Sequence, residues 1–220
     1  MDKANIFLDE KILIGTDEVG VGDFFGPLVV VACRVNIDDF VDKKILAQIN
    51  DSKQLSDSKI YNIFEAIKEQ VKYSVVIIEN EKYNKIYDQV QNSHILKALG
   101  HNKALINLIS NNPDFKNDKI VIDEFVNSKK YFSYLEKIKE PYIFQNITFC
   151  QKAESKYLAV ACASIIARWH FLEKIKELET ELKITLPLGA SNDVKTLVRQ
   201  YKKIHPDKAK TFIKMHFKDS

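Results

Sequence analysis

The segment that most constrains the fold is AVACASIIA at residues 159–167, an apolar run of small side chains. A helix of this composition can approach a neighbouring β-sheet closely, because few of its side chains are bulky. Apolar residues continue beyond the segment at helical spacing and predict one long helix over residues 155–182. The set comprises Ile165, Trp169, Leu172, Ile175, Leu178 and Leu182. The chain is therefore predicted to be an α/β protein in which this helix lies against a sheet.

Two β-rich runs at residues 12–19 and 27–35 supply the start of that sheet. The residues between them include Gly20, Gly22, Gly26 and Pro27, which are typical of a turn, so the two runs predict a hairpin. Runs at 73–78, 119–125 and 142–149 have the composition of three further strands. The sequence thus predicts five strands.

Helices are predicted between and after the strands. Ser56 or Asp57 is placed to cap a helix that continues to about Val71, and apolar spacing predicts helices over 94–109 and 129–138. Pro187 and Gly189 break the chain before two shorter basic helices. Because no interdomain linker is evident, we expect one domain over residues 1–220, with an N-terminal extension at 1–11 and a basic C-terminal helical segment at 193–220.

Composition bounds the class of protein. Hydrophobic residues make up 45% of the 220 residues and charged residues 29%, values typical of a packed core. No apolar run is long enough to span a bilayer and the N-terminus lacks an apolar signal core, so we expect a cytoplasmic protein. The three cysteines lack metal-ligand spacing and are expected to be reduced. A net charge of +3 does not by itself identify a nucleic-acid binder, and the basic C-terminal segment fits either phosphate contacts or a solvated helix face.

Acidic residues occur where a soluble α/β protein has little reason to place them. Asp17 and Glu18 interrupt an apolar strand, where adjacent residues point to opposite faces, and Asp123 follows three apolar strand residues. Glu154 precedes the long helix. Acids from two strand ends and a helix start can converge on one cation, and hard oxygen ligands favour Mg²⁺ or Mn²⁺ over zinc. The alternative, that these acids cap turns or pair with Lys and Arg, is left open by the pattern alone.

Several motifs, taken in order, resemble the type 2 ribonuclease H family. They are GTDEVGVGDFFGPLVVVA at 15–32, DSKQL at 51–55, HNKAL at 101–105, VIDEF at 121–125, CQKAESKYLAVACASIIAR at 150–168, LPLGAS at 186–191 and KMHF at 214–217. Asp23 followed by two aromatic residues, and Glu rather than Asp in QKAES, resemble the ribonuclease HIII branch.

This resemblance implies an RNase H-like fold, a five-stranded mixed β-sheet flanked by helices, with C-terminal helices. It assigns Asp17, Glu18, Asp123 and Glu154 as the catalytic and metal-binding acids, with Asp17 and Asp123 as the expected direct ligands. It also implies two Mg²⁺ or Mn²⁺ ions and an endonuclease that hydrolyses the RNA strand of RNA–DNA hybrids, leaving 5′-phosphate and 3′-hydroxyl ends.

Substrate contacts are expected from the glycine loop Gly20, Val21 and Gly22, whose backbone can approach the hybrid and bind ribose 2′-hydroxyls. Lys53, Lys152 and Ser155 are expected near phosphates; the last two lie in QKAES. Val21 departs from the Thr usual in the branch, and Glu124 from the usual Gln. His94 and His101 are expected to have structural roles because both lie on an apolar helix.

The expected partner is an RNA–DNA hybrid, bound by a monomer without a small-molecule cofactor. Members of the HIII branch usually carry a substrate-binding domain before the catalytic one. Here only residues 1–11 precede the first predicted strand, so we expect the basic C-terminal helices to hold the substrate. Two alternatives stay open: ribonuclease HII-type incision at a single ribonucleotide in duplex DNA, and an inactive hybrid-binding module.

Overall fold

The computed structural model describes residues 11–49 and 55–218 and contains a five-stranded sheet with strand order β3-β2-β1-β4-β5. β2 is antiparallel to both of its neighbours, β1 and β3, whereas β1, β4 and β5 run parallel to one another. Their bounds are β1 (Ile12–Val19), β2 (Leu28–Asn36), β3 (Lys72–Ile78), β4 (Ile120–Asp123) and β5 (Ile147–Cys150). The predicted hairpin and mixed sheet are both confirmed.

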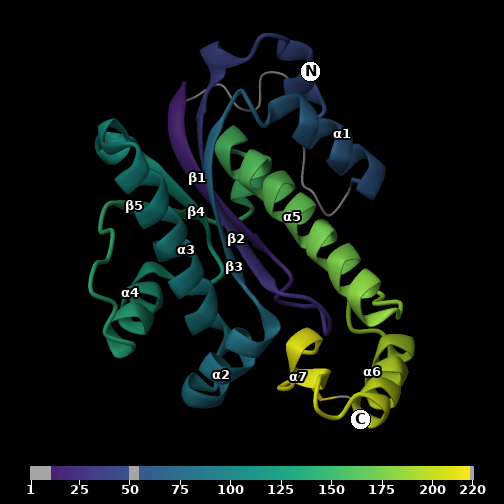
Figure 1. Ribbon diagram of the computed structural model, residues 1–220. Coiled ribbons are helices and arrows are strands. Elements are labelled where there is room, and N and C mark those ends of the chain that lie inside the picture. The colour runs from purple at the N-terminus through teal and green to yellow at the C-terminus, as the bar shows by residue number, and fades with distance from the viewer. Residues whose placement is uncertain (1–10, 50–54, 219–220) are drawn as a thin grey trace.

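Helices cover both faces of this sheet (Figure 1). One face packs against α5 (Leu158–Leu182) and α1 (Asp57–Ile67), and the other against α3 (Ser93–Asn111) and α4 (Ser128–Lys137). The remaining helices are α2 (Asn80–Val90), α6 (Asn192–Ile204) and α7 (Ala209–Phe212), with short 3-10 turns at η2 (Ile37–Asp39), η3 (Lys43–Ala47), η5 (Pro113–Asn117) and η6 (Ala153–Ser155). Each face of the sheet therefore has a hydrophobic core of its own.

The alternation of side chains along β1 assigns successive residues to the two cores. Leu13 packs in the core beneath α5, whereas Ile14 packs in the core beneath α3. At Gly15 an added Cβ would lie 2.3 Å from the backbone nitrogen of Val160, so α5 rests directly on the β1 backbone. The small side chains of α5 permit this approach, as the sequence predicted.

Three element boundaries differ clearly from the sequence prediction, and one helix was not predicted. Residues 142–146 form a loop rather than the start of β5, because the Asn102 side chain donates to the Tyr142 carbonyl at 2.6 Å and accepts from the Phe144 N–H at 3.3 Å. The α2 helix was not predicted, and its N-cap makes no side-chain capping bond that would have marked it. Ser56 caps α1 as expected, but α1 ends at Ile67. The predicted start of the long helix at residue 155 is instead the end of η6.

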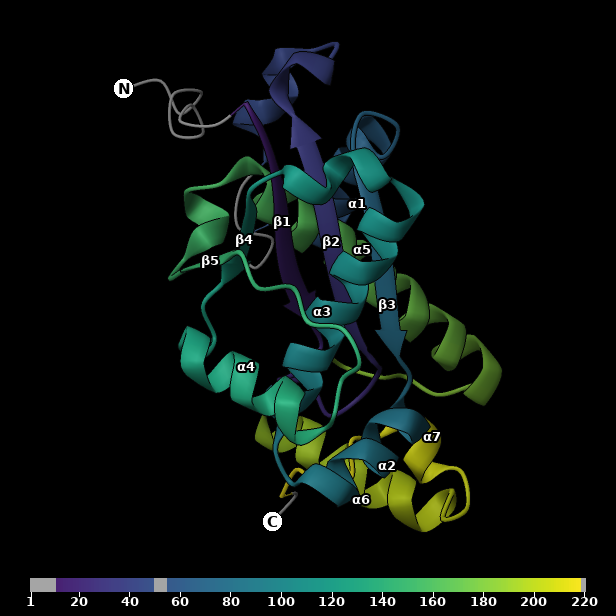
Figure 2. The same cartoon turned by 90° about the vertical axis from the view of Figure 1, so that its left-hand side faces the viewer.

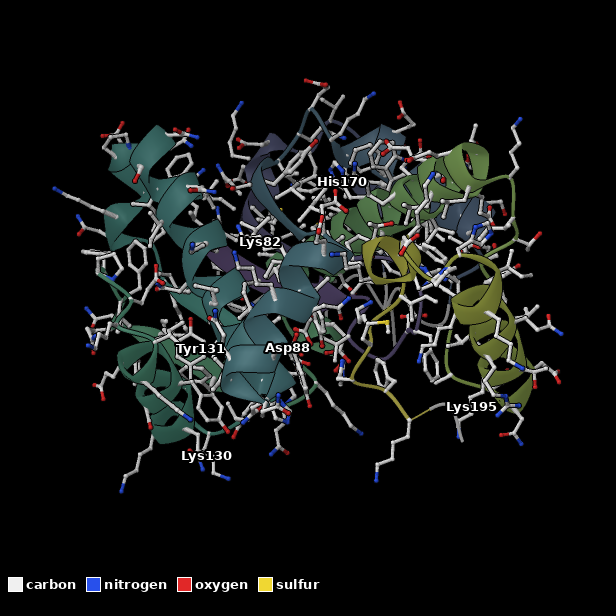
Figure 3. The ribbon with its side chains drawn as sticks, turned by 60° about the horizontal axis from the view of Figure 1, so that its bottom comes forward. Lys82, Asp88, Lys130, Tyr131, His170 and Lys195 are labelled. Carbon is white, nitrogen blue, oxygen red and sulfur yellow. The ribbon has the colours of Figure 1, made fainter. Side chains whose placement is uncertain are left out.

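The C-terminal helices lie beside α2 at one end of the molecule (Figure 2). Viewed from that end, α2, which carries Lys82 and Asp88, lies between α4, marked by Lys130, and α6, marked by Lys195 (Figure 3). An isolated β-bridge between Phe25 and Ile213 ties the C-terminal segment to the loop before β2.

The cysteines are free thiols, as expected, although Cys150 is only half-buried. Within the described residues, no helix combines the length and apolar character that a membrane span requires.

Candidate active site

Two predicted acids lie side by side at the ends of parallel strands. Thr16 of β1 is paired with Ile122 of β4, so the next residues, Asp17 and Asp123, occupy neighbouring positions toward the carboxyl ends of these two strands. The Ala153 N–H donates to Asp123 Oδ1 at 2.8 Å, which brings η6 to the same strand ends. Glu154 follows directly in η6 and is half-buried. The sheet thus brings Asp17 and Asp123 together. Glu154 is the residue after Ala153, whose N–H binds Asp123.

The electrostatic environment of Asp17 disfavours its ionised form. Burial, the like charge of Glu18 and that of Asp123 raise the pKa of Asp17 well above its ordinary value. Hydrogen bonds from Ser164 on α5 and from the Glu18 N–H, the latter 2.8 Å long, oppose this rise only in part. A divalent cation would supply the positive charge that this carboxylate lacks, and the oxygen-only donor set suits Mg²⁺ or Mn²⁺.

Glu18 points to the opposite face of the sheet, as the alternation of β1 requires. Its Oε2 accepts from His101 Nε2 at 2.9 Å, and its Oε1 is paired with the ammonium of Lys97. Burial opposes ionisation of Glu18, but the hydrogen bond and charge of His101, together with Lys97, lower its pKa. No three His, Cys, Asp or Glu side chains in the described parts of the chain form a ready metal cluster, and Glu18 is held on the far face.

A buried network on α3 fixes this orientation of Glu18. His101 is fully buried, and its Nδ1 lies 2.7 Å from the Thr16 hydroxyl on β1. The Phe125 ring stacks on His101 with centroids 5.3 Å apart and carries the Lys97 ammonium 4.1 Å from its own centroid. Sequence reasoning gave His101 only a structural role and did not consider Lys97. Their spacing of four residues on one helix face, with His101 in the HNKAL motif, was the available signal.

The base of the glycine loop is held by residues from the C-terminal part of the chain. Gly20 has φ 99°, and an added Cβ would lie 2.2 Å from the Pro27 carbonyl oxygen, so only glycine fits there. Asp23 Oδ1 accepts from the Gly189 N–H at 2.6 Å. Lys214 Nζ donates to the carbonyl oxygens of Asp23, at 3.1 Å, and Gly26. These contacts fix the base of the loop.

The middle of the loop differs from its base. Around Gly22 nothing lies within 4 Å of an added Cβ, so the surface there is open. Val21 packs its side chain against the core beneath α3. The hydrophobic Val21 side chain therefore has a packing role, and the backbone of Gly22 is accessible from outside.

The predicted phosphate-binding residues have different surroundings. Lys53 lies outside the described residues. Lys152 is exposed and has φ 55° at the start of η6, and its carbonyl accepts from the Ser155 hydroxyl at 2.8 Å. Ser155 thus uses its hydroxyl to stabilise the turn that carries Glu154.

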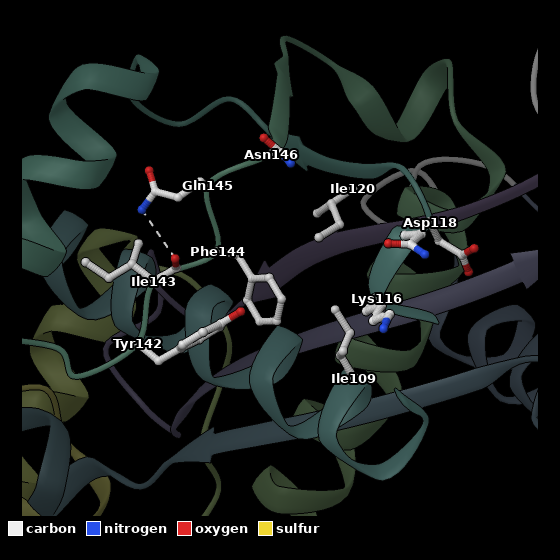
Figure 4. A pocket seen from close by; sticks show the side chains of 10 residues that line it. Ile109, Lys116, Asp118, Ile120, Tyr142, Ile143, Phe144, Gln145 and Asn146 are labelled. Carbon is white, nitrogen blue, oxygen red and sulfur yellow. Dashed lines mark hydrogen bonds between the residues drawn. The ribbon is translucent and has the colours of Figure 1, made fainter. Parts of the chain in front are cut away.

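A pocket of 510 Å³ lies away from these acids, at the opposite end of β4 (Figure 4). Its lining includes Ile120 at the start of β4, Lys116 and Asp118 before it, and Tyr142 and Phe144 from the preceding loop of β5. Asp118 is paired with Arg34 at 2.6 Å. The pocket contains none of the four predicted acids.

The model of the family described as ribonuclease HII matches residues 14–220. The chain belongs to this ribonuclease HII family. Ribonuclease HIII of Bacillus cereus (strain AH187) is 39% identical over 206 residues, which are 93% of this chain and 66% of that protein. Ribonuclease HIII of Bacillus anthracis (strain CDC 684 / NRRL 3495) gives the same values. The chain therefore spans slightly less than two thirds of these relatives.

Solved structures in the family share the fold. Bst-RNase HIII in complex with Mn²⁺ has a TM-score of 0.88 and 35% identity, covering 100% of this chain and 70% of that one. Aquifex aeolicus RNase H3 has a TM-score of 0.74 and 32% identity, covering 96% of this chain and 74% of that one. The predicted resemblance to the HIII branch and the RNase H-like fold are confirmed.

Proposed function

We propose that this chain is a metal-dependent endonuclease that hydrolyses the RNA strand of RNA–DNA hybrids. The observation that carries the proposal is the pair Asp17 and Asp123 at adjacent strand ends, where burial and like-charged neighbours disfavour the ionised form of Asp17. Such a pair is costly unless a cation joins it. Membership of the ribonuclease HII family, and the relative solved in complex with Mn²⁺, support the same reading.

In this proposal Asp17 and Asp123 hold Mg²⁺ or Mn²⁺, and Glu154 contributes from η6. Two such ions, when bound, would activate a water molecule and stabilise the 3′-oxygen leaving group, giving 5′-phosphate and 3′-hydroxyl ends. Glu18 adds negative charge from the other face of β1 in the orientation that His101 fixes. Asp123 is held in place by the Ala153 N–H, so its second oxygen is available to an ion.

The glycine loop is proposed to bind the hybrid through its backbone. Its base is fixed by Lys214 and Gly189, whereas the surface at Gly22 is open to an approaching ribose. Lys152 is exposed next to Glu154 and is proposed to contact a phosphate. The cytoplasmic location and the monomeric state expected from the sequence stay predictions.

The test is cleavage of a labelled RNA–DNA hybrid in Mg²⁺ or Mn²⁺ by the wild type, Asp123→Asn and Glu124→Gln. Asp123→Asn should lower kcat by a factor of about 10³ or more, because a ligand charge is lost. Glu124→Gln is the matched control, since it removes the adjacent carboxyl group and should keep most activity. Inert wild type with both ions, or equal loss in both variants, would contradict the proposal.

A second substrate separates hybrid cleavage from ribonuclease HII-type incision. The same enzymes are given a DNA duplex with one embedded ribonucleotide. We expect the continuous hybrid to be cleaved much faster, because the relatives named above are ribonucleases HIII. Preferential cutting at the single ribonucleotide would assign the chain to the HII type of activity instead.

A further inference from the structure

Both oxygens of the Glu18 carboxylate are engaged by residues of α3. His101 Nε2 lies 2.9 Å from Oε2, and the Lys97 ammonium is paired with Oε1. The side chain of Glu18 is 13% exposed and that of Lys97 is 9% exposed. Glu18 therefore has a positive partner within the protein, whereas Asp17 has carboxylates as its charged neighbours.

The two contacts on Glu18 differ in what they supply. The ionised carboxylate can only accept, so His101 donates its Nε2–H, and the Thr16 hydroxyl on the other side fixes the ring. His101 thus sets the direction of the carboxylate. Lys97 supplies a full charge, and it is buried with its ammonium over the face of Phe125. A buried ammonium is costly unless it is paired, so Lys97 and Glu18 depend on one another.

We propose that Lys97 is a built-in counter-ion of Glu18 that limits how tightly the acidic site binds divalent cations. This inference rests on the proposed function, because it takes Asp17 and Asp123 as the metal ligands. The Lys97 ammonium offsets the negative charge that Glu18 adds from the other face of β1, and it repels a divalent ion bound by Asp17 and Asp123. His101 keeps Glu18 oriented without Lys97, so the charge can be removed while the position of the carboxylate is kept.

The consequence is a site that binds its ions weakly enough to exchange them. Lys97 is a positioning and charge-balancing residue in this scheme, since it acts through Glu18 and not on the substrate. Removing its charge should raise cation affinity, whereas a residue that merely supported the fold would lower affinity or leave it unchanged. The direction of the change therefore distinguishes the two roles.

The experiment is Mn²⁺ binding to the full chain by isothermal titration calorimetry, without nucleic acid. Lys97→Met should bind Mn²⁺ roughly tenfold more tightly than the wild type, because a nearby like charge is gone. Lys97→Arg keeps the charge and should retain wild-type affinity. Lys103→Met is the matched control, because Lys103 lies on the same helix and is half-buried. It should leave Mn²⁺ affinity unchanged.

A double-mutant cycle assigns the effect to Glu18. Glu18→Gln leaves the Lys97 ammonium without its counter-ion and should weaken Mn²⁺ binding, and Lys97→Met in that background should return the affinity to near the wild-type value, because the two opposite charges are then removed together. Circular dichroism checks that each variant is folded, and Lys97→Gln serves if the Met variant is not. Unchanged or weaker Mn²⁺ binding in a folded neutral variant, or a folded Glu18→Gln Lys97→Met variant that binds Mn²⁺ no better than Glu18→Gln, would overturn the inference.

Failure of the proposed function gives a different result. If the wild type binds no Mn²⁺ in this titration, the proposed metal site is wrong, and so is a counter-ion role of Lys97 at that site. If the wild type binds Mn²⁺ and Asp123→Asn weakens binding, the site stands. The response of Lys97→Met then decides the counter-ion role alone.

Discussion

Asp17 lies near the middle of the sheet with Glu18 and Asp123 as like-charged neighbours, and burial adds to the cost of its ionisation. Its folded-state pKa is raised, so its contribution to stability is complete below the ordinary Asp pKa and is lost as pH rises through the folded value. Ionisation of Asp17 therefore destabilises the metal-free protein. This charge is also the one that the proposed metal requires.

Asp17→Asn should accordingly stabilise the metal-free protein and abolish its activity. We expect an increase on the order of 1 kcal/mol in the free energy of unfolding at pH 7, because the amide cannot ionise. Urea denaturation in EDTA measures the stability, and calorimetry should show weaker Mn²⁺ binding. A variant that is less stable than the wild type, or that binds Mn²⁺ equally well, would contradict this account of Asp17.

At the scale of elements, the site depends on segments far apart in the sequence. Lys214, which follows α7, is fully buried and donates to carbonyl oxygens of the loop between β1 and β2. Burial lowers the pKa of Lys214 to about 7, although Asp23 opposes this shift. Between pH 7 and the ordinary Lys pKa, the unfolded chain holds a proton that the folded chain has lost, so stability rises with pH in that range.

Lys214→Met should remove this pH dependence and destabilise the fold. The loss of donors to two loop carbonyls should cost about 1–3 kcal/mol near pH 9, where the wild-type lysine is neutral. Thermal unfolding at pH 7 and pH 9 measures both effects: the wild type should gain stability with pH through this group, at most about 1.4 kcal/mol per pH unit. The same pH response in the variant would show that another group titrates.

Local signals predicted most elements and the convergence of two acids. The β-rich runs predicted β1 and β2, Ser56 or Asp57 predicted the start of α1, and the small residues of α5 predicted its close packing on the sheet. Because ligands of open α/β sheets bind beyond the ends of the strands, Asp17 and Asp123 were expected to lie close together. The loop before β5 was missed because its conformation depends on Asn102, a residue of another element.

The residues of the site whose contacts the sequence did not predict were missed for the same physical reason. Lys97 and His101 face Glu18 only because α3 docks on one side of the sheet, and no local pattern states which helix residues will meet a given strand residue. Lys214 had the appearance of a residue on a solvated basic helix. Its burial follows from a contact with Gly26, 188 residues earlier, which no periodicity in the sequence reveals.

For the molecule as a whole, the charge distribution matters more than the net charge of +3. The basic helices α6 and α7 lie at the end of the molecule opposite η3 (Figure 1). Replacing the exposed Lys203 and Lys208 with Gln should lower hybrid affinity and reduce the slope of log K against log salt by about one to two, if both neutralise phosphates.

The control for this prediction is a pair of exposed lysines at the other end, Lys43 and Lys44 in η3. Their replacement by Gln changes the net charge equally and should leave the salt slope unchanged. Fluorescence anisotropy of a labelled hybrid in EDTA measures binding without cleavage, and light scattering on the same samples checks the expected monomer. Equal slopes for both double variants would show that the C-terminal helices do not bind the hybrid.

The support of the glycine loop by Gly189 and Lys214 has a consequence for how the protein is made. The groups that hold residues 20–26 are synthesised more than 160 residues after them. Between the synthesis of Asp123 and that of Gly189, the nascent chain has the acids of β1 and β4 without these supports for the loop beside them. The loop beside the proposed metal site is therefore held only after Gly189 and Lys214 have been synthesised.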